Sequence, residues 1–156
     1  MANERQHEAL IHDYYTRGMK EVAQGNVDVL DDFYHADYVD RTPHFHIAGG
    51  TGLAGLKQGL LENSKRMTNV EFVPQLILAR DDTVVAWWAV RALHTTPHPV
   101  RHVGDADAAG QSLEFSGVNI YRLRDGKIAE SWEYDDNYEV LLRQGVVQMT
   151  AAHPGG

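Results

Sequence analysis

The sharpest chemical feature of the sequence is a carboxylate that follows a run of aromatic residues. Asp136 ends the stretch Trp132–Asp136, where it alternates with Trp132 and Tyr134 along an expected strand. Residues two apart in a strand share one face of the sheet, which sets the Asp136 carboxylate beside two aromatic rings. A carboxylate among apolar rings holds its proton more tightly and can exchange it near neutral pH. Asp136 is therefore a candidate general acid/base, and capping of a following helix is the other interpretation that this spacing leaves open.

The dipeptide Asp125-Gly126 lies between two β-rich runs and predicts a tight hairpin, because both residues tolerate positive φ. A two-residue turn pairs Arg124 with Lys127 and so predicts which side chains share a face. An aromatic wall with a few polar groups suits a small-molecule pocket. The predicted inner face has this character and consists of Phe115, Asn119, Tyr121, Leu123, Ile128, Glu130, Trp132, Tyr134 and Asp136.

The opposite face of this hairpin is expected to be a solvated outer face or a dimer surface. Its apolar members Val118 and Ile120 are the reason for considering a dimer. A β-bulge would reverse the facing and would turn Asp135 inward in place of Asp136. The predicted outer residues are Ser116, Val118, Ile120, Arg122, Ala129, Ser131, Glu133 and Asp135.

Further polar side chains are candidates for contact with a substrate. Asn119 is an inward-facing amide that needs a partner, and it could stabilise an enolate oxygen or make a structural hydrogen bond. His94 ends an expected strand on the same side as Trp88. It could orient a substrate carbonyl, and a structural hydrogen bond is the alternative. His102 falls in an irregular segment at 96–110 that could cover a pocket.

The histidines do not have a recognised spacing of metal ligands, so we expect no metal site. His44 and His46 alternate, and His94, His98 and His102 follow downstream, whereas a site needs three or more converging ligands. The sequence has no cysteine, which excludes disulfides, thiolate catalysis and cysteine-based metal sites.

The elements that must position these residues are helices in the first half and strands in the second. Apolar residues at helical spacing predict helices over 3–24, 26–34 and 53–61, with a loop at 37–43. Pro74 suggests an edge strand or a bulge, and Trp87 and Trp88 fall on opposite faces of one strand. The predicted strands are 70–79, 84–95, 113–123 and 127–136, and a last helix follows at 138–144.

Helices followed by strands indicate an α+β fold rather than an α/β fold. A curved antiparallel sheet would then pack against the N-terminal helices and enclose a deep pocket. Tyr14 or Tyr15 could reach this pocket from the first helix, and packing in the core is the alternative.

The length and charge of the chain limit its organisation and its partners. With 156 residues it suits a single domain, expected over 1–150, with a disordered tail at 151–156. Lys and Arg total 14 and Asp and Glu total 22, a net charge of −8 without a basic cluster. This argues against nucleic acid and against an anionic membrane as partners. No apolar run approaches about 18 residues and no signal core begins the chain, so we expect a cytoplasmic protein.

The stretch from Phe115 to Asp136 resembles the C-terminal signature of the SnoaL-like polyketide cyclases, which belong to the nuclear-transport-factor-2-like superfamily. The similarity lies in Gly117, in Asp125-Gly126 and in the spacing of Glu130, Trp132 and Asp136. Three earlier segments resemble other parts of the family in the same order: 38–43, 52–57 and 82–95.

This resemblance implies a cone-shaped α+β barrel with a deep pocket. It also implies ring closure of a polyketide by intramolecular aldol condensation, without metal or organic cofactor. It assigns general acid/base catalysis to Asp136, and His94 and Asn119 are the further expected catalytic residues. The expected substrate-binding residues are Tyr14, Tyr15, Trp88, His102, Phe115, Tyr121, Trp132 and Tyr134.

Other activities on this fold remain open at this point. The alternatives are a cofactor-independent hydroxylase, a dehydratase or an isomerase, or a non-catalytic module for small-molecule binding or dimerisation. The expected partners are a small-molecule substrate and further copies of the chain in a homodimer or homotetramer.

Overall fold

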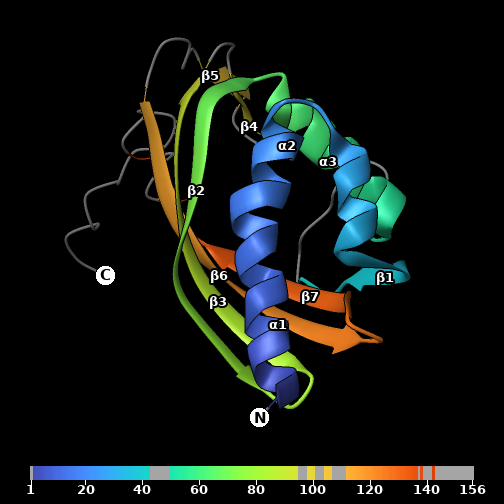
Figure 1. Cartoon of the computed structure of the whole chain (residues 1–156). Helices are drawn as coiled ribbons and strands as arrows, with labels where there is room; N and C mark the ends of the chain where they lie inside the picture. Colours follow the sequence, from blue (N-terminus) through green and yellow to red (C-terminus); the bar gives the residue numbers. More distant parts are fainter. Residues whose placement is uncertain are drawn as a thin grey trace, which may run out of the picture.

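The computed structural model describes residues 2–42, 50–94, 98–100, 104–106, 112–136, 138 and 142. Helices precede strands along the chain and pack against one face of a curved sheet, which confirms the α+β class (Figure 1). The helical elements are α1 Ala2–Asp13, η1 Tyr14–Gly18, α2 Met19–Ala23, η2 Val27–Asp32 and α3 Leu53–Ser64. The strands are β1 Tyr34–Asp40, β2 Met67–Arg80, β3 Thr83–His94, β4 His98–Val100, β5 Gly104–Ala106, β6 Ser112–Arg124 and β7 Lys127–Asp135.

The main sheet has the strand order β1-β7-β6-β3-β2. The pairs β2–β3, β3–β6 and β6–β7 are antiparallel, whereas β1 runs parallel to β7, so the predicted antiparallel sheet is a mixed one. Among the described residues the sheet does not close, and the barrel implied by the resemblance is an open curved sheet with β1 and β2 at its edges. The expected helix end and loop over 34–40 are strand β1 instead.

The four long strands agree with the sequence pattern. Asp125 and Gly126 have φ values of 51° and 74°, as the predicted hairpin turn requires. Pro74 lies in the edge strand β2, next to an irregularity in the pairing with β3. Trp88 is buried and its neighbour Trp87 is 48% exposed, which confirms that the two face opposite sides of the sheet.

The first helix contains a π-helical turn, η1, that brings two adjacent tyrosines to the sheet. A π-helical turn takes one residue more than an α-helical turn, so it changes which side chains face inward. Tyr14 and Tyr15 are both buried as a result. Figure 1 shows this helix lying across the face of the sheet. Packing in the core is therefore confirmed for both tyrosines.

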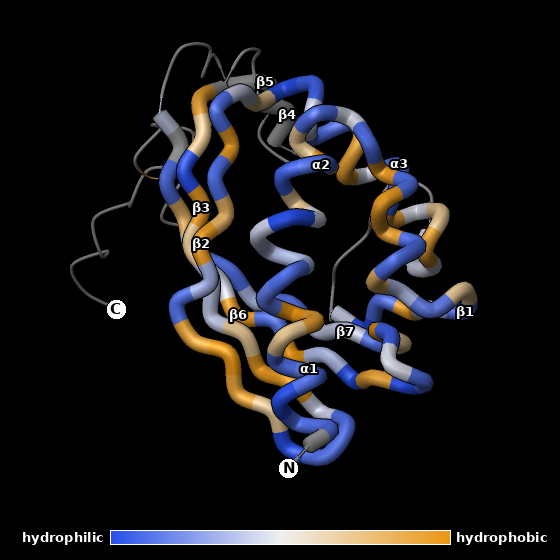
Figure 2. Tube along the Cα trace, viewed as in Figure 1, coloured by the Kyte–Doolittle hydropathy of each residue, from blue (hydrophilic) through white to orange (hydrophobic). Residues whose placement is uncertain are grey.

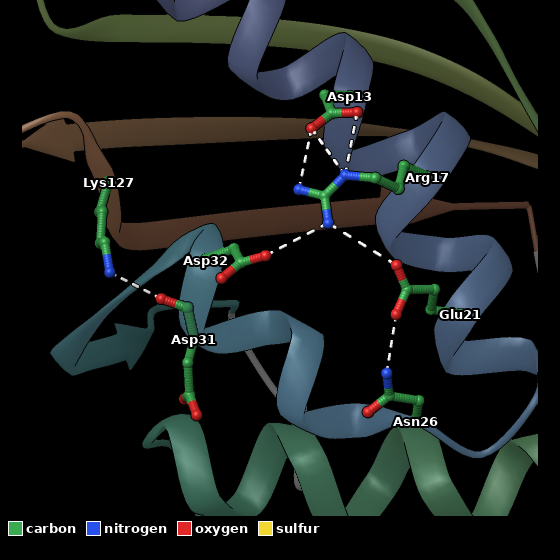
Figure 3. Close-up of polar contacts among 7 residues, drawn as sticks. All are labelled: Asp13, Arg17, Glu21, Asn26, Asp31, Asp32 and Lys127. Carbon is green, nitrogen blue, oxygen red and sulfur yellow. Dashed lines mark hydrogen bonds and ion pairs between the residues drawn. The ribbon is translucent and has the colours of Figure 1, made fainter.

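A network of ion pairs around Arg17 ties η1 to the 3-10 helix η2 (Figure 3). The guanidinium contacts Asp13 at 3.0 Å and Asp32 at 3.2 Å, and it lies 4.8 Å from the centre of the Phe33 ring. Exposed ion pairs of this kind contribute little stability each. They link the turn that carries Tyr14 and Tyr15 to the end of η2.

The expected irregular segment at 96–110 contains the two short strands β4 and β5, which pair with each other. Tyr138 and Leu142 are helical, while the rest of the predicted last helix and the tail at 151–156 lie outside the described residues. No helix in the described part of the chain is long and apolar enough to cross a membrane.

Candidate functional site

A bulge in the hairpin of β6 and β7 reverses the predicted facing of β7. Leu123 lies opposite Ile128, but Arg122 lies opposite Glu130, so Ala129 is an extra residue in β7. Beyond that point odd-numbered residues of β7 pair with odd-numbered residues of β6, whereas a hairpin without a bulge would pair odd-numbered with even-numbered residues. The prediction that Asn119 and Trp132 share the inner face is therefore wrong, and Asn119 lies opposite Glu133.

Trp132 and Tyr134 lie on the outer face, away from the helices. Tyr134 is 55% exposed, and the Arg122 guanidinium lies 5.7 Å from the centre of the Trp132 ring. The structure therefore does not bring these two predicted substrate-binding residues to Asn119.

Asp136 follows the end of β7 and binds the backbone of β6. The Ser116 N–H donates a hydrogen bond to the Asp136 carboxylate at 2.9 Å, and the Asp136 N–H donates to the Ser116 carbonyl oxygen at 3.1 Å. Ser116 shares its face with Val118, two positions along β6. The structure thus does not join Asp136 to Asn119, and its catalytic role stays a prediction.

Glu133 is the carboxylate that the structure joins to Asn119. The Asn119 Nδ2 donates a hydrogen bond to Glu133 Oε2 at 3.1 Å, and the Glu133 backbone N–H donates to Thr42 Oγ1 at 2.9 Å. Burial raises the pKa of Glu133 to about 7, the hydrogen bond from Asn119 opposes this, and the Asp135 and Asp40 carboxylates add to the rise. The group can therefore take up and release a proton near neutral pH.

Trp88 fixes the orientation of the Asn119 side chain. The Trp88 Nε1 donates a hydrogen bond to Asn119 Oδ1 at 2.6 Å. An indole N–H is a donor only, so it must face the amide oxygen and not the amide nitrogen. The amide NH2 group is thereby directed at Glu133, where its hydrogen bond favours the ionised carboxylate.

Buried tyrosine hydroxyls lie near the Asn119 and Glu133 side chains. The Tyr15 Oη lies 2.6 Å from the Tyr121 Oη and donates a long hydrogen bond of 3.4 Å to Asn119 Oδ1. The Tyr38 Oη lies 2.6 Å from the Ser131 Oγ. Burial raises the pKa of Tyr15, Tyr38 and Tyr121 above the usual value. Their hydroxyls therefore stay protonated at neutral pH and act as hydrogen-bond donors.

Gly117 provides the space for the Trp88 indole. A Cβ atom at this position would lie 2.5 Å from Trp88 Cζ2 and 2.9 Å from the Tyr134 carbonyl oxygen. Phe115 packs edge-on against the same indole, with ring centres 5.6 Å apart. A glycine at 117 thus lets Trp88 lie against β6 and reach Asn119.

Gly117→Ala is expected to lower the free energy of unfolding by about 1–3 kcal/mol, because Trp88 must move to make room. Unfolding in urea, followed by circular dichroism, measures the change. Gly52→Ala is the matched control, since a Cβ there meets only the Tyr38 carbonyl oxygen at 3.8 Å. An equal loss in both variants would contradict the contact between Gly117 and Trp88.

The remaining predicted site residues are placed only in part. Phe115 is partly buried beside Trp88, on the inner face, and its contact with a substrate stays a prediction. His94 ends β3 with its backbone opposite Met67, and its side chain lies outside the described part. His102, His44 and His46 also lie outside it. Among the described side chains, no three His, Asp or Glu residues form a group that could hold a metal ion.

Glu133, Tyr38 and Ser131 are the site residues that the sequence analysis missed. All three depend on the bulge at Ala129 or on strand β1. The sequence does carry one signal for the bulge, because Ile128 and Ala129 are adjacent apolar residues in a strand that otherwise alternates. Successive residues of a regular strand face opposite sides, so two adjacent residues that are both buried, as Ile128 and Ala129 are, indicate an extra residue in the strand.

Comparison with known proteins gives one family and a set of shared folds. The family model of the SnoaL-like polyketide cyclases matches residues 14–144. A search of curated proteins found no match. The chain resembles AclR, a proposed hydroxylase from Streptomyces galilaeus, with a TM-score of 0.73 and 18% identity over 95% of this chain and 90% of AclR.

Two further solved structures have the same fold. One is wild-type IdmH, a proposed polyketide cyclase from Streptomyces antibioticus, with a TM-score of 0.67 and 22% identity over 91% of this chain and 99% of IdmH. The other is a proposed SnoaL-like polyketide cyclase from Jannaschia sp. CCS1, with a TM-score of 0.70 and 17% identity over 88% and 90% of the two chains. At these identities the likeness shows the fold alone.

Proposed function

The chain belongs to the SnoaL-like polyketide cyclase family, and we propose on this premise that it closes a ring in a carbonyl-rich, polyketide-like small molecule with Glu133 as general acid/base. The observation that carries the proposal is the half-buried Glu133 carboxylate, whose pKa is raised to about 7 by burial beside Asn119. General acid/base catalysis is most effective when the pKa lies near the working pH. The proposal moves the role expected for Asp136 to a neighbouring carboxylate on the opposite face of the sheet.

In the proposed reaction, the ionised Glu133 takes a proton from the carbon next to a substrate carbonyl. The resulting enolate carbon attacks a second carbonyl carbon of the same molecule, which forms the ring C–C bond and leaves an alkoxide. The protonated Glu133 then returns its proton to that oxygen. Protons and electrons balance within the substrate and one carboxylate, so this route needs no cofactor.

Asn119 and the tyrosines have supporting roles in this proposal. An amide nitrogen carries two N–H groups, and one of those of Asn119 binds Glu133. In the proposal the other binds an enolate oxygen, as in an oxyanion-type site. The side chains that orient Asn119 are almost fully buried: Tyr15, Trp88 and Tyr121. They position Asn119 and do not themselves form a large contact surface for substrate.

The proposal is tested by incubating the protein with a panel of linear aryl polyketones and analysing the products by liquid chromatography and mass spectrometry. Aldol closure leaves the substrate mass unchanged, or lowers it by one water after dehydration, and shifts the retention time. A product heavier by one oxygen atom would instead support the hydroxylase alternative. No change in any substrate at any pH would count against an enzyme of either kind.

Trp88→Phe is expected to raise the pKa of Glu133 above about 7. Without the indole N–H, the Asn119 amide can turn its oxygen toward Glu133, which disfavours the ionised carboxylate. A titration of the side-chain carboxyl carbons by 13C NMR measures this directly, without a substrate. Phe115→Leu is the control, because it removes packing on the same indole without touching a polar contact. An unchanged titration in Trp88→Phe would refute the positioning role of Trp88.

A further inference from the structure

A pair of buried hydroxyls lies beside Glu133 on the inner face of the sheet. Ser131 and Glu133 are two residues apart on β7, so their side chains share this face. Strand β1 runs parallel to β7, with Asp40 paired to Ser131, so Tyr38 projects to the same side from the neighbouring strand. Figure 2 shows the two strands side by side at one edge of the sheet. The Tyr38 Oη lies 2.6 Å from the Ser131 Oγ, and we call these two groups the hydroxyl pair.

The hydroxyl pair has one proton more than it has hydrogen bonds. Each hydroxyl carries one proton, and the contact between Tyr38 and Ser131 uses only one of the two, whichever oxygen is the donor. No other group in the described part of the chain accepts the second proton. Tyr38 is only 3% exposed and Ser131 only 4% exposed. Because buried donors nearly always have a partner, the second proton requires an acceptor from outside the described part of the chain.

The second pair of buried hydroxyls, Tyr15 and Tyr121, does not have this surplus. Tyr121 can donate to Tyr15 at 2.6 Å, and Tyr15 donates to Asn119 Oδ1 at 3.4 Å, so both protons are used. The surplus proton thus belongs to the side of Glu133 that faces β1. Glu133 lies close enough to Tyr38 for its charge to help raise the pKa of the Tyr38 hydroxyl. The surplus donor is therefore a neighbour of the proposed general acid/base.

On the basis of the proposed function, we propose that the hydroxyl pair donates a hydrogen bond to the oxygen of the carbonyl that is attacked during ring closure. This oxygen becomes an alkoxide, and a donor already in place stabilises the charge as it develops. The proton that neutralises the alkoxide still comes from Glu133, so the balance of atoms in the reaction is unchanged. Strand β7 lies between β6 and β1, so Asn119 and the hydroxyl pair hold the two reacting carbonyl groups on opposite sides of Glu133.

The test separates proton removal from ring closure. Proton removal is measured as exchange of the protons next to a carbonyl for deuterium in D2O, followed by proton NMR. The probe is an aryl monoketone, which has no second carbonyl and cannot close a ring, so its exchange depends on Glu133 and Asn119 alone. Ring closure is measured on a substrate from the polyketone panel by liquid chromatography and mass spectrometry.

The double variant Tyr38→Phe with Ser131→Ala is expected to lower kcat for ring closure by at least about tenfold and to leave the exchange rate unchanged. Phenylalanine keeps the ring that packs edge-on against Tyr34, with ring centres 4.7 Å apart. Each single variant keeps one hydroxyl with its proton and is expected to lose less. Ser64→Ala is the matched control, because the Ser64 hydroxyl already donates to the Leu61 carbonyl oxygen at 2.8 Å, and both rates should stay normal.

Ring closure at the normal rate in the double variant would overturn the proposal, because the acceptor of the surplus proton would then not be a reacting carbonyl. Equal losses of exchange and ring closure would overturn it as well, since the hydroxyl pair would then act on the proton step or on the fold. Circular dichroism of the double variant distinguishes these two causes. Exchange that persists in Glu133→Gln, or is absent from the unchanged protein, would instead overturn the proposed role of Glu133 and this inference with it.

Discussion

Glu133→Gln is expected to lower kcat for ring closure by at least about 100-fold, the usual contribution of a general acid/base. Glutamine keeps the volume of glutamate and can still accept the hydrogen bond from the Asn119 amide, but it cannot take a proton. The loss should therefore appear in kcat, with a smaller effect on KM, because the change removes a group that acts in the transition state. The measurement is steady-state kinetics on a substrate found in the polyketone panel.

Asp136 provides the matched control for this experiment, and Asp135 provides a second comparison. Asp136→Asn removes a carboxylate that accepts a hydrogen bond from the Ser116 backbone on the outer side, and it is expected to retain most of the activity. Asp135→Asn changes the residue next to it, on the same face of β7 as Glu133, and it is expected to lower the pKa of Glu133 without abolishing turnover, because the Asp135 charge adds to the rise of that pKa. A full loss in Asp136→Asn together with normal activity in Glu133→Gln would overturn the proposal and restore Asp136 as the acid/base.

The local pattern of the sequence predicts most of the fold correctly. Hydrophobic periodicity and the Asp125-Gly126 turn locate α3 and the four long strands, because these signals arise from residues close together in the chain. Strand β1 is the main exception. Its residues Tyr34 and Tyr38 face the core, but its hydrogen bonds are made with β7, roughly ninety positions later in the sequence, and local spacing does not report such a pairing.

The candidate site could be predicted only as far as strand β6. The inward facing of Asn119 and Tyr121 follows from alternation, and both are buried as expected. On β7 a single extra residue, Ala129, exchanges the two faces, and so Glu133 takes the inward position that alternation gives to Trp132. Because side chains in a strand alternate between the two faces, one extra residue changes which carboxylate faces inward, although it leaves the fold the same.

The same carboxylate should make the stability of the protein depend on pH. The pKa of Glu133 rises from an ordinary value of 4.5 to about 7 on folding, mainly through burial. Between these values the folded protein holds a proton that the unfolded chain has released. The free energy of unfolding should therefore fall as the pH rises from about 4.5 to about 7, and the loss is complete above about 7. At about 1.4 kcal/mol per pH unit, this pKa difference corresponds to at most about 3 kcal/mol of unfolding free energy. Because Glu133 is partly exposed, solvent screening makes its contribution smaller than this bound.

Glu133→Gln isolates this contribution, because glutamine carries no proton to titrate. Urea unfolding of both proteins at pH 5 and pH 8, which are about the ends of the window, gives a double difference in which the histidines and other carboxylates cancel. The variant is expected to lose less stability between these pH values than the unchanged protein does. Asp136→Asn should behave like the unchanged protein. Equal slopes in Glu133→Gln and the unchanged protein would mean that Glu133 is ionised in the fold as readily as in water, which would remove the basis of its proposed catalytic role.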